Sequence, residues 1–251
     1  MVRLAHVSDW HNQWSQFPEA DVYVITGDML DNYPIVDMSP RRSRQGGWIP
    51  YDPFCVQREI VHEREERLQL DWFKRKFTDK KKPLGLRHFF PKNCKHNPVV
   101  IVRGNHDFTD LGPMFGGKHF EVSDDSTRFQ DYCGLRFGGF RGVNRFSDEW
   151  WGERDPERIG MDIEMMPDDL DVVISHSPPH GILDMGYSKH IGSHEFTKWI
   201  NERLYDDDKR MPRLFCYGHA HGGRGRFETD GGTTIFSNAA CGKQIIELDI
   251  S

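Results

Sequence analysis

The sequence lacks the features that would assign it to a membrane or a nucleic-acid-wrapping class. No apolar run approaches the length needed to span a membrane, and the N-terminus carries no apolar signal segment. Lys and Arg number 33 against 39 Asp and Glu, a net charge of -6, so no basic excess exists for wrapping long nucleic acid. We therefore expect neither a membrane nor long nucleic acid as a partner. A small phosphorylated substrate stays open, because a pair of metal ions would supply local positive charge.

Cysteine usage excludes a disulfide framework. The five cysteines are odd in number and scattered, and no two have the C-x-x-C spacing. They indicate reduced thiols and predict a cytoplasmic location. The sequence also has no internal repeat and no long low-complexity tract. At 251 residues we expect a single domain over residues 1–251 that buries a large core.

Residues 34–97 differ from the rest in composition. They hold several prolines, the segment RRSRQGG and a run of basic residues around the charged, amphipathic stretch Val56–Phe77. We interpret them as a helical and loop insertion. A substrate lid, a dimer contact and a solvated decoration all remain open as its role, and the oligomeric state does not follow from the sequence.

Five apolar runs are each followed at once by polar residues that can bind metal ions. Such runs are typical of buried strands, and ligands gather at the carboxyl ends of strands in sheets of this kind. The predicted strands are Val2–Val7, Asp21–Thr26, Asn97–Arg103, Asp171–Ser175 and Arg213–Tyr217.

Further elements follow from local patterns. An apolar stripe predicts a helix over His194–Tyr205. The C-terminal segments Arg224–Glu228, Thr233–Ser237 and Gln244–Ile250 alternate like antiparallel strands. His6 lies inside the first predicted strand, and we expect it to be structural.

The polar residues at the strand ends form an ordered set. Any one of these short motifs has an ordinary explanation as a cap or a turn. All of them, in one order and all at strand ends, are hard to attribute to chance. The set is Asp9-Trp10-His11, Gly27-Asp28, Gly104-Asn105-His106-Asp107, His176 and Gly218-His219-Ala220-His221.

This series resembles the signature of the calcineurin-like metallophosphoesterases: D-x-H, G-D-x-x-D, G-N-H-D, a single H and G-H-x-H. The resemblance extends from Asp9 to His221. It implies an α/β fold, a four-layer α-β-β-α sandwich of two mixed β-sheets flanked by helices.

The resemblance also implies two divalent metal ions that share one carboxylate, for which Asp28 matches. The remaining implied ligands are Asp9, His11 and His221 for one ion and Asn105, His176 and His219 for the other. Mixed imidazole, carboxylate and amide ligands favour Mn²⁺, with Fe, Ni²⁺ or Zn²⁺ as alternatives.

The implied mechanism is attack on phosphorus by a hydroxide that bridges the two ions. In this hypothesis His106 protonates the leaving oxygen as general acid, and Asp107 orients the ring of His106. Asp31 is either a hydrogen-bond partner of a metal ligand or a solvent-facing cap.

The expected substrate is a small phosphodiester or nucleotide. His176-Ser177-Pro178-Pro179 resembles the H-x-P-P loop of the family's cyclic-nucleotide phosphodiesterase branch, and the next residue, His180, is a candidate substrate contact. The segments Leu135–Trp151 and Asp230–Asn238 are similar to the small MPPED-type phosphodiesterases. The further candidates for substrate binding are Arg141, Asn144, Trp150 and Trp151, with a packing cluster as the favoured alternative for the two tryptophans.

The sequence therefore predicts a metal-dependent phosphodiesterase acting on small diesters such as cyclic nucleotides, 2′,3′-cyclic forms included. Protein Ser/Thr phosphatases of the same fold are less similar, because they read G-N-H-E where this chain has Asp107. A broad phosphomonoesterase, a nuclease and a non-catalytic scaffold remain alternatives. The scaffold is disfavoured because every ligand position is filled.

Overall fold

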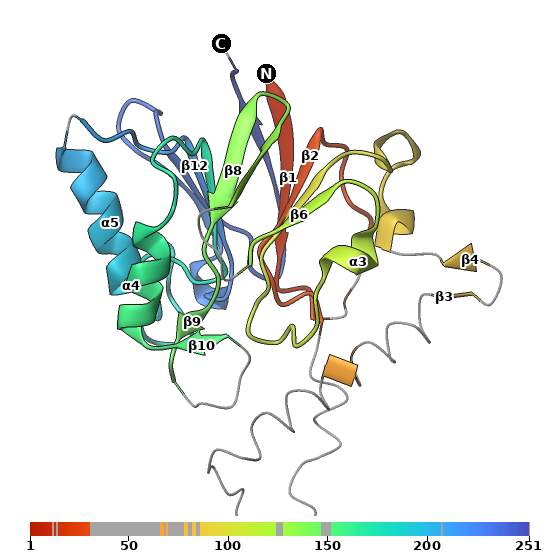
Figure 1. The fold of residues 1–251 in the computed structure, drawn as a ribbon, viewed down its shortest axis with the longest axis horizontal. Helices are drawn as coiled ribbons and strands as arrows, with labels where there is room; N and C mark the ends of the chain where they lie inside the picture. Colours follow the sequence, from red (N-terminus) through yellow and green to blue (C-terminus); the bar gives the residue numbers. More distant parts are fainter. Residues whose placement is uncertain are drawn as a thin grey trace, which may run out of the picture.

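Two β-sheets packed face to face form the centre of the molecule. The computed structural model describes residues 1–11, 13, 15–30, 66–67, 69, 78–79, 82–83, 86–123, 128–146, 152–206 and 208–250. Both chain termini lie at one end of the sheets (Figure 1), and the loops after the parallel strands lie at the other end.

The first sheet is mixed and has the strand order β15-β1-β2-β5-β6. Its last strand in the chain, β15, pairs antiparallel with β1, and the other neighbours are parallel. Its strands are β1 (Val2–Ser8), β2 (Val22–Ile25), β5 (Val99–Ile101), β6 (His119–Glu121) and β15 (Gly242–Leu248).

The second sheet is also mixed, with the order β13-β14-β12-β11-β8-β7. The pairs at its two edges are antiparallel and the central ones parallel. Its strands are β7 (Phe129–Tyr132), β8 (Leu135–Gly139), β11 (Val172–Ile174), β12 (Leu214–Tyr217), β13 (Gly225–Glu228) and β14 (Ile235–Asn238). Two small separate pairs are β3 (Thr78–Asp79) with β4 (Lys82–Pro83) and β9 (Val143–Asn144) with β10 (Glu153–Arg154).

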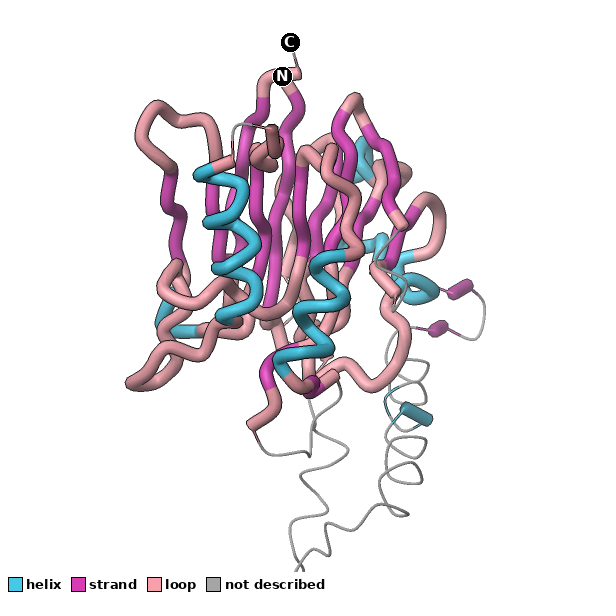
Figure 2. Tube along the Cα trace, turned by 60° about the vertical axis from the view of Figure 1, so that its left-hand side comes forward, coloured by secondary structure: helices cyan, strands magenta, loops and turns pink. Residues whose placement is uncertain are grey.

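Helices cover the two outer faces. The larger, α4 (Pro156–Glu164) and α5 (His194–Tyr205), lie on the second sheet, as Figure 1 and Figure 2 show. On the first sheet lie the short helix α3 (Gly112–Phe115) and the 3-10 turns η1 (Leu86–Phe89) and η2 (Lys92–Cys94); a third turn is η3 (His221–Gly223).

Three hydrophobic clusters hold these layers together. The middle one lies between the sheets, where Leu4 and Val24 of the first meet Ile174 and Leu214 of the second. One outer cluster packs α4 and α5 on the second sheet, and the other packs residues around η1 and η2 on the first. The order of the layers is helix, sheet, sheet, helix. The predicted fold class is therefore confirmed.

The predicted insertion over residues 34–97 lies largely outside the described residues, as does most of the predicted helix Val56–Phe77. Its final part is described. There Leu86, Phe90 and Cys94 are buried in the outer cluster of the first sheet.

Two expectations from composition can be compared with the described residues. Within them, no helix combines the length and the apolar character required to cross a membrane. Cys94, Cys133, Cys216 and Cys241 are free thiols, and Cys55 lies outside the described part of the chain.

Candidate metal centre

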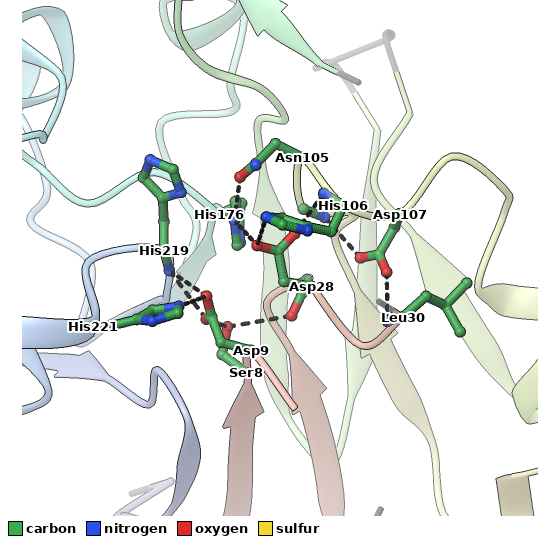
Figure 3. Close-up of polar contacts among 12 residues, drawn as sticks. Ser8, Asp9, Asp28, Leu30, Asn105, His106, Asp107, His176, His219 and His221 are labelled. Carbon is green, nitrogen blue, oxygen red and sulfur yellow. Dashed lines mark hydrogen bonds and ion pairs between the residues drawn. The ribbon is translucent and has the colours of Figure 1, made fainter. Parts of the chain in front are cut away.

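The two sheets bring their strand ends together at one edge, and the predicted ligands lie there. Asp9 follows β1 and Asp28 follows β2, both in the first sheet, whereas His176 follows β11 and His219 follows β12 in the second. Figure 3 shows these side chains converging from both sides, with Asp28 between them. The site therefore spans the boundary between the two sheets.

One group of possible ligands consists of Asp9, His11 and His221, whose ligand atoms lie within 4.8 Å of one another. The Nε2 of His221 donates to Asp9 Oδ1 at 3.0 Å, and the backbone N–H of His219 donates to Asp9 Oδ2 at 3.0 Å. The carboxylate of Asp9 is buried, while 41% of the His221 side chain is exposed. This group is therefore partly open to solvent, through His221.

A second group consists of Asp28, His176 and His219. Oδ2 of Asp28 lies 3.2 Å from His176 Nε2, and the same nitrogen lies 3.1 Å from Asn105 Oδ1. All except His219 are almost fully buried. The sets predicted for the two ions are thus each brought together, with Asn105 beside the second.

Asp28 and His11 connect the two groups. Together with His106 they form a third set of atoms within 4.8 Å of one another. The rings of His11 and His106 meet edge to face at 4.8 Å between centroids, and His106 Nε2 lies 3.9 Å from Asp28 Oδ2. Asp28 is therefore within reach of both sides, as a shared ligand must be.

The backbone at this site adopts an uncommon conformation. Asp9, His11, Asp28 and His219 have positive φ angles of 55°, 43°, 49° and 63°. Left-handed backbone is disfavoured for residues with a side chain, and such strain is concentrated at functional sites. These residues lie just beyond the strand ends, where the chain leaves the regular strand conformation.

Two positions of the site require glycine because neighbouring side chains approach the backbone closely there. A Cβ at Gly104 would overlap the carboxylate of Asp28, and a Cβ at Gly218 would overlap Ser8 and the carboxylate of Asp9. Each glycine belongs to a motif of the signature. The glycines therefore leave room for the two carboxylates.

The buried carboxylates and histidines of the site shift one another's pKa values. Burial raises the pKa of the Asp28 carboxyl, but the charges of His176 and His106 outweigh it and hold the pKa well below its usual range. Burial lowers the pKa of His176, yet Asp28 and Asp9 together raise it to about 9. Nδ1 of that ring donates to Thr26 O at 2.6 Å, which points Nε2 toward Asp28 and Asn105.

The pKa values of three further histidine rings, His106, His219 and His221, are also shifted. Burial, with the charge of His176, lowers the pKa of His219 to about 4, and burial also lowers the pKa of His106. The hydrogen bond to Asp9 raises the pKa of His221. Neutral imidazoles are the form that binds metal ions.

Asp107 requires a correction. We predicted that it orients the ring of His106, but both of its oxygens accept backbone N–H groups, from Gly104 at 2.9 Å and from Leu30 at 3.0 Å (Figure 3). A buried carboxylate needs such donors, and these two point at it. Burial, with the charge of Asp28, raises its pKa to about 7. Asp107 therefore ties the G-N-H-D loop to the segment that follows Asp28 and positions both.

Gln69 is a contributor that sequence reasoning missed. Its side chain is 1% exposed; Nε2 donates to His106 O at 2.6 Å and Oε1 accepts from Phe108 N at 2.8 Å. It thus fixes the backbone of the G-N-H-D loop from within the predicted insertion. No motif marks a single glutamine in a charged stretch, so the sequence contains no signal for it.

Ser8 and Thr26 were also missed, although both are strand-end residues next to motifs. The hydroxyl of Ser8 donates to Asp9 Oδ2. Backbone oxygens cannot be assigned a partner from sequence, so the bond from His176 to Thr26 O could not have been predicted.

The structure shows the surroundings of the three predicted substrate contacts, Arg141, Asn144 and His180. Asn144 Nδ2 donates to Gly192 O at 3.0 Å, and the ring of His180 stacks on His194 at 3.8 Å between centroids. Burial and the charges of Arg103 and Arg154 lower the pKa of Arg141 to about 10. Their roles toward a substrate stay predictions. Asp31, Trp150 and Trp151 lie outside the described residues.

The donor set fits a pair of divalent cations. His11 Nε2 is buried and has no hydrogen-bond partner among the described residues, as expected for a ring nitrogen that binds a metal ion. Imidazole, carboxylate and amide oxygen donors together suit first-row divalent ions. The two carboxylates also supply the negative charge that such ions neutralise.

Ligand groups of this kind, at the joint edge of two mixed sheets between helical layers, define a metallophosphoesterase. The chain belongs to the calcineurin-like phosphoesterase family, whose model matches residues 2–223. The predicted family is thereby confirmed, and the structure brings together His and Asp residues that could hold metal ions.

Curated relatives match the chain over different lengths. Probable rhamnogalacturonate lyase C of Emericella nidulans is 22% identical over 235 residues, which cover 90% of this chain and 18% of that protein. Metallophosphoesterase domain-containing protein 1 of Homo sapiens is 33% identical over 79 residues, 31% of this chain and 22% of that protein. The chain matches about a fifth of the length of these relatives.

A solved structure supports the fold. It has a TM-score of 0.55 and 17% sequence identity, covering 94% of this chain and 89% of that chain.

Proposed function

We propose that the chain is a metal-dependent phosphodiesterase of small diesters, with cyclic nucleotides, 2′,3′-cyclic forms included, as its substrates. The observation that carries the proposal is the position of Asp28, whose carboxylate lies within reach of ligand atoms from both sides of the site. The H-x-P-P loop supports the choice of a diester. It is held in place by Ser193, whose N–H donates to Pro178 O at 2.8 Å.

In this proposal Asp9, His11 and His221 hold one divalent ion, and Asn105, His176 and His219 hold the other, with Asp28 shared. We propose Mn²⁺ as the native ion. When bound, such ions supply Lewis acidity toward phosphoryl oxygens and a nucleophile at neutral pH.

His106 is the residue of this chain that moves a proton. Its side chain is 23% exposed and its ring lies at the solvent side of Asp28, where a leaving oxygen would depart. Burial lowers its pKa in the free protein, and a bound anionic phosphate raises it again, which favours the protonated form when it is needed. Asp107 and Gln69 hold the backbone on which His106 sits.

The test is hydrolysis by protein that has been stripped with a chelator and then reloaded with Mn²⁺. We expect turnover of bis(p-nitrophenyl) phosphate and of 2′,3′-cyclic nucleotides that depends on Mn²⁺. Asp28→Asn should abolish both turnover and tight metal binding, whereas Asp230→Asn, in an exposed turn, should change neither.

Three results would contradict the proposal in different ways. No hydrolysis of any ester by the metal-loaded protein would favour a non-catalytic scaffold. Hydrolysis restricted to monoesters would favour a phosphomonoesterase. Degradation of oligonucleotides in preference to cyclic nucleotides would favour a nuclease.

A further inference from the structure

A cavity of about 240 Å³ opens beside the candidate metal centre. Asp9 and His11 form part of its lining, so it is continuous with the first ligand group. It forms where β15 begins next to the end of β1, at the pairs Val7 with Lys243 and Ser8 with Gly242. The remaining wall comes from the residue after η3 and from the loop after β1.

Arg224 lines this cavity on one side. It follows η3, three residues after His221, so the turn that carries a candidate ligand also carries this guanidinium. The guanidinium lies against Gly242, where any Cβ would collide with it, and Nη1 donates to Cys241 O at 3.5 Å. These contacts leave most of its five N–H donors available.

Lys243 lines the cavity from β15. Its Nζ donates to Gln16 O at 3.0 Å, which uses one of its three N–H donors. Among the residues that the structure describes, neither Lys243 nor Arg224 forms an ion pair. Their neighbours do: Arg226, two residues after Arg224, pairs with Glu228 at 2.6 Å, and Arg3 of β1 pairs with Glu247.

We propose that this cavity binds a second anionic group of the substrate, a phosphate or a carboxylate, separate from the phosphate that is hydrolysed, through Arg224 and Lys243. This inference rests on the proposed function and narrows its substrate class. The scissile phosphate lies at the metal centre, and the second oxyanion lies beside Asp9 and His11 in the cavity. Guanidinium and ammonium groups without carboxylate partners are suited to such a group.

The size and charge of the cavity indicate that it binds one part of a ligand rather than a whole ligand. Ligand sites usually measure roughly 300 to 1,000 Å³, so this cavity fits one substituent of a larger substrate. A simple cyclic nucleotide has a single phosphate, so it would leave the side chains of Arg224 and Lys243 without an anionic partner. A nucleoside with a 2′,3′-cyclic phosphate and a second phosphate elsewhere would match both sites.

The first experiment compares substrates with one and two anionic groups. Adenosine 2′,3′-cyclic phosphate is compared with the same compound carrying a 5′-phosphate, and a p-nitrophenyl phosphodiester with a carboxylate on its other ester group distinguishes a carboxylate from a phosphate. The variants are Arg224→Gln and Lys243→Gln. The matched controls are Arg226→Gln and Lys198→Gln. Arg226 lies in β13, which begins directly after Arg224, and it pairs with Glu228; Lys198 pairs with Glu202 on α5.

We expect each variant to raise KM for the doubly anionic substrate roughly 10-fold to 100-fold, the effect of losing one contact to a charged group, with kcat little changed. KM for adenosine 2′,3′-cyclic phosphate should stay constant. An equal loss for both substrates would place the two residues in support of the metal centre and overturn the inference. No loss for either substrate would overturn it as well.

A binding measurement separates this inference from the proposed function. Calorimetry with Mn²⁺-loaded protein compares adenosine 3′,5′-bisphosphate with adenosine 5′-phosphate. We expect tighter binding of the bisphosphate, and loss of this preference in Arg224→Gln and Lys243→Gln. If the preference is present but no ester is hydrolysed, the subsite stands and the proposed function fails. If wild-type protein shows no preference, the subsite is wrong whatever the activity.

Discussion

At the scale of single residues, the G-N-H-D motif divides its tasks between neighbouring side chains. The ring of His106 faces Asp28 and solvent, while the carboxylate of Asp107 faces the backbone of Gly104 and Leu30. The backbone N–H of His106 also donates to Asp28 Oδ1 at 2.8 Å. Because that bond does not involve the ring, the motif supports Asp28 even when the side chain of His106 is removed.

His106→Ala should therefore separate catalysis from metal binding. We expect kcat to fall roughly 100-fold to 10,000-fold, the usual contribution of a general acid. The manganese content measured by mass spectrometry should stay near that of the wild type, since the bond from the backbone to Asp28 is kept. A parallel loss of manganese would make His106 a ligand and remove it as the acid.

At the scale of elements, one guanidinium joins the 3-10 turn η1 to the end of α3 and to the segments that precede β5 and β6. Arg87 donates to the carbonyl oxygens of Phe115, Gly116, Lys95, Asn97 and Lys118. No other side chain of η1 or η2 has a comparable set of bonds among the described residues. The turn closes one side of the cluster around Phe90 and Phe115.

Arg87→Lys should loosen this element without altering the metal centre. A lysine has three donors in place of five, so we expect the free energy of unfolding to fall by about 2 kcal/mol. Urea titration of metal-free protein measures this. Arg136→Lys, an arginine whose partners Asp131 and Asp169 are exposed, should cost less than about 1 kcal/mol. Similar losses in the two variants would show that the carbonyl contacts of Arg87 add little.

The elements also show what the sequence could predict. The central strands β2, β5, β11 and β12 were predicted because strands buried on both faces are continuous apolar runs, and β1 was predicted from its alternating pattern. The helix α5 was predicted with its observed ends from its apolar stripe, which faces the second sheet. The structure adds that Ser193 caps it by accepting from Phe196 N.

Other elements left no comparable signal. The edge strands β6 and β7 are short, β7 is largely exposed, and β8 ends in two glycines, so none of the three has a clear apolar pattern. In the site, the motifs predicted which residues meet. They could not predict that Asp107 bonds to Leu30 or that Gln69 bonds to His106 O, because those partners are distant in the chain and two of the four groups are backbone.

At the scale of the whole molecule, a buried histidine couples folding to pH. His6 is fully buried and its ring nitrogens bond to Ser237 Oγ at 2.8 Å and Thr26 Oγ1 at 2.9 Å, so it joins the two sheets. Burial lowers its pKa to about 3, against 6.5 for a free histidine. Between these values the unfolded chain binds a proton that the folded chain does not.

The contribution of His6 to stability should therefore be fully present above pH 6.5 and decline as the pH falls below it, by up to about 1.4 kcal/mol per pH unit. His6→Gln removes the titration. We expect urea titrations of the metal-free variant between pH 7 and pH 5 to show a smaller decline than the wild type. His119→Gln, at an exposed position of β6, serves as control; an equal decline in wild type and His6→Gln would refute the assignment.

The path of the last strand has a consequence for how the site assembles. The first half of the chain supplies Asp9, His11, Asp28 and Asn105, and the second half supplies the three remaining histidines. Yet β15, at the end of the second half, inserts beside β1 in the sheet of the first. Neither half is self-sufficient: one lacks an edge strand and the other lacks both carboxylates. Because β15 completes the sheet that carries both carboxylates, we expect two metal ions to be held only after β15 has paired with β1.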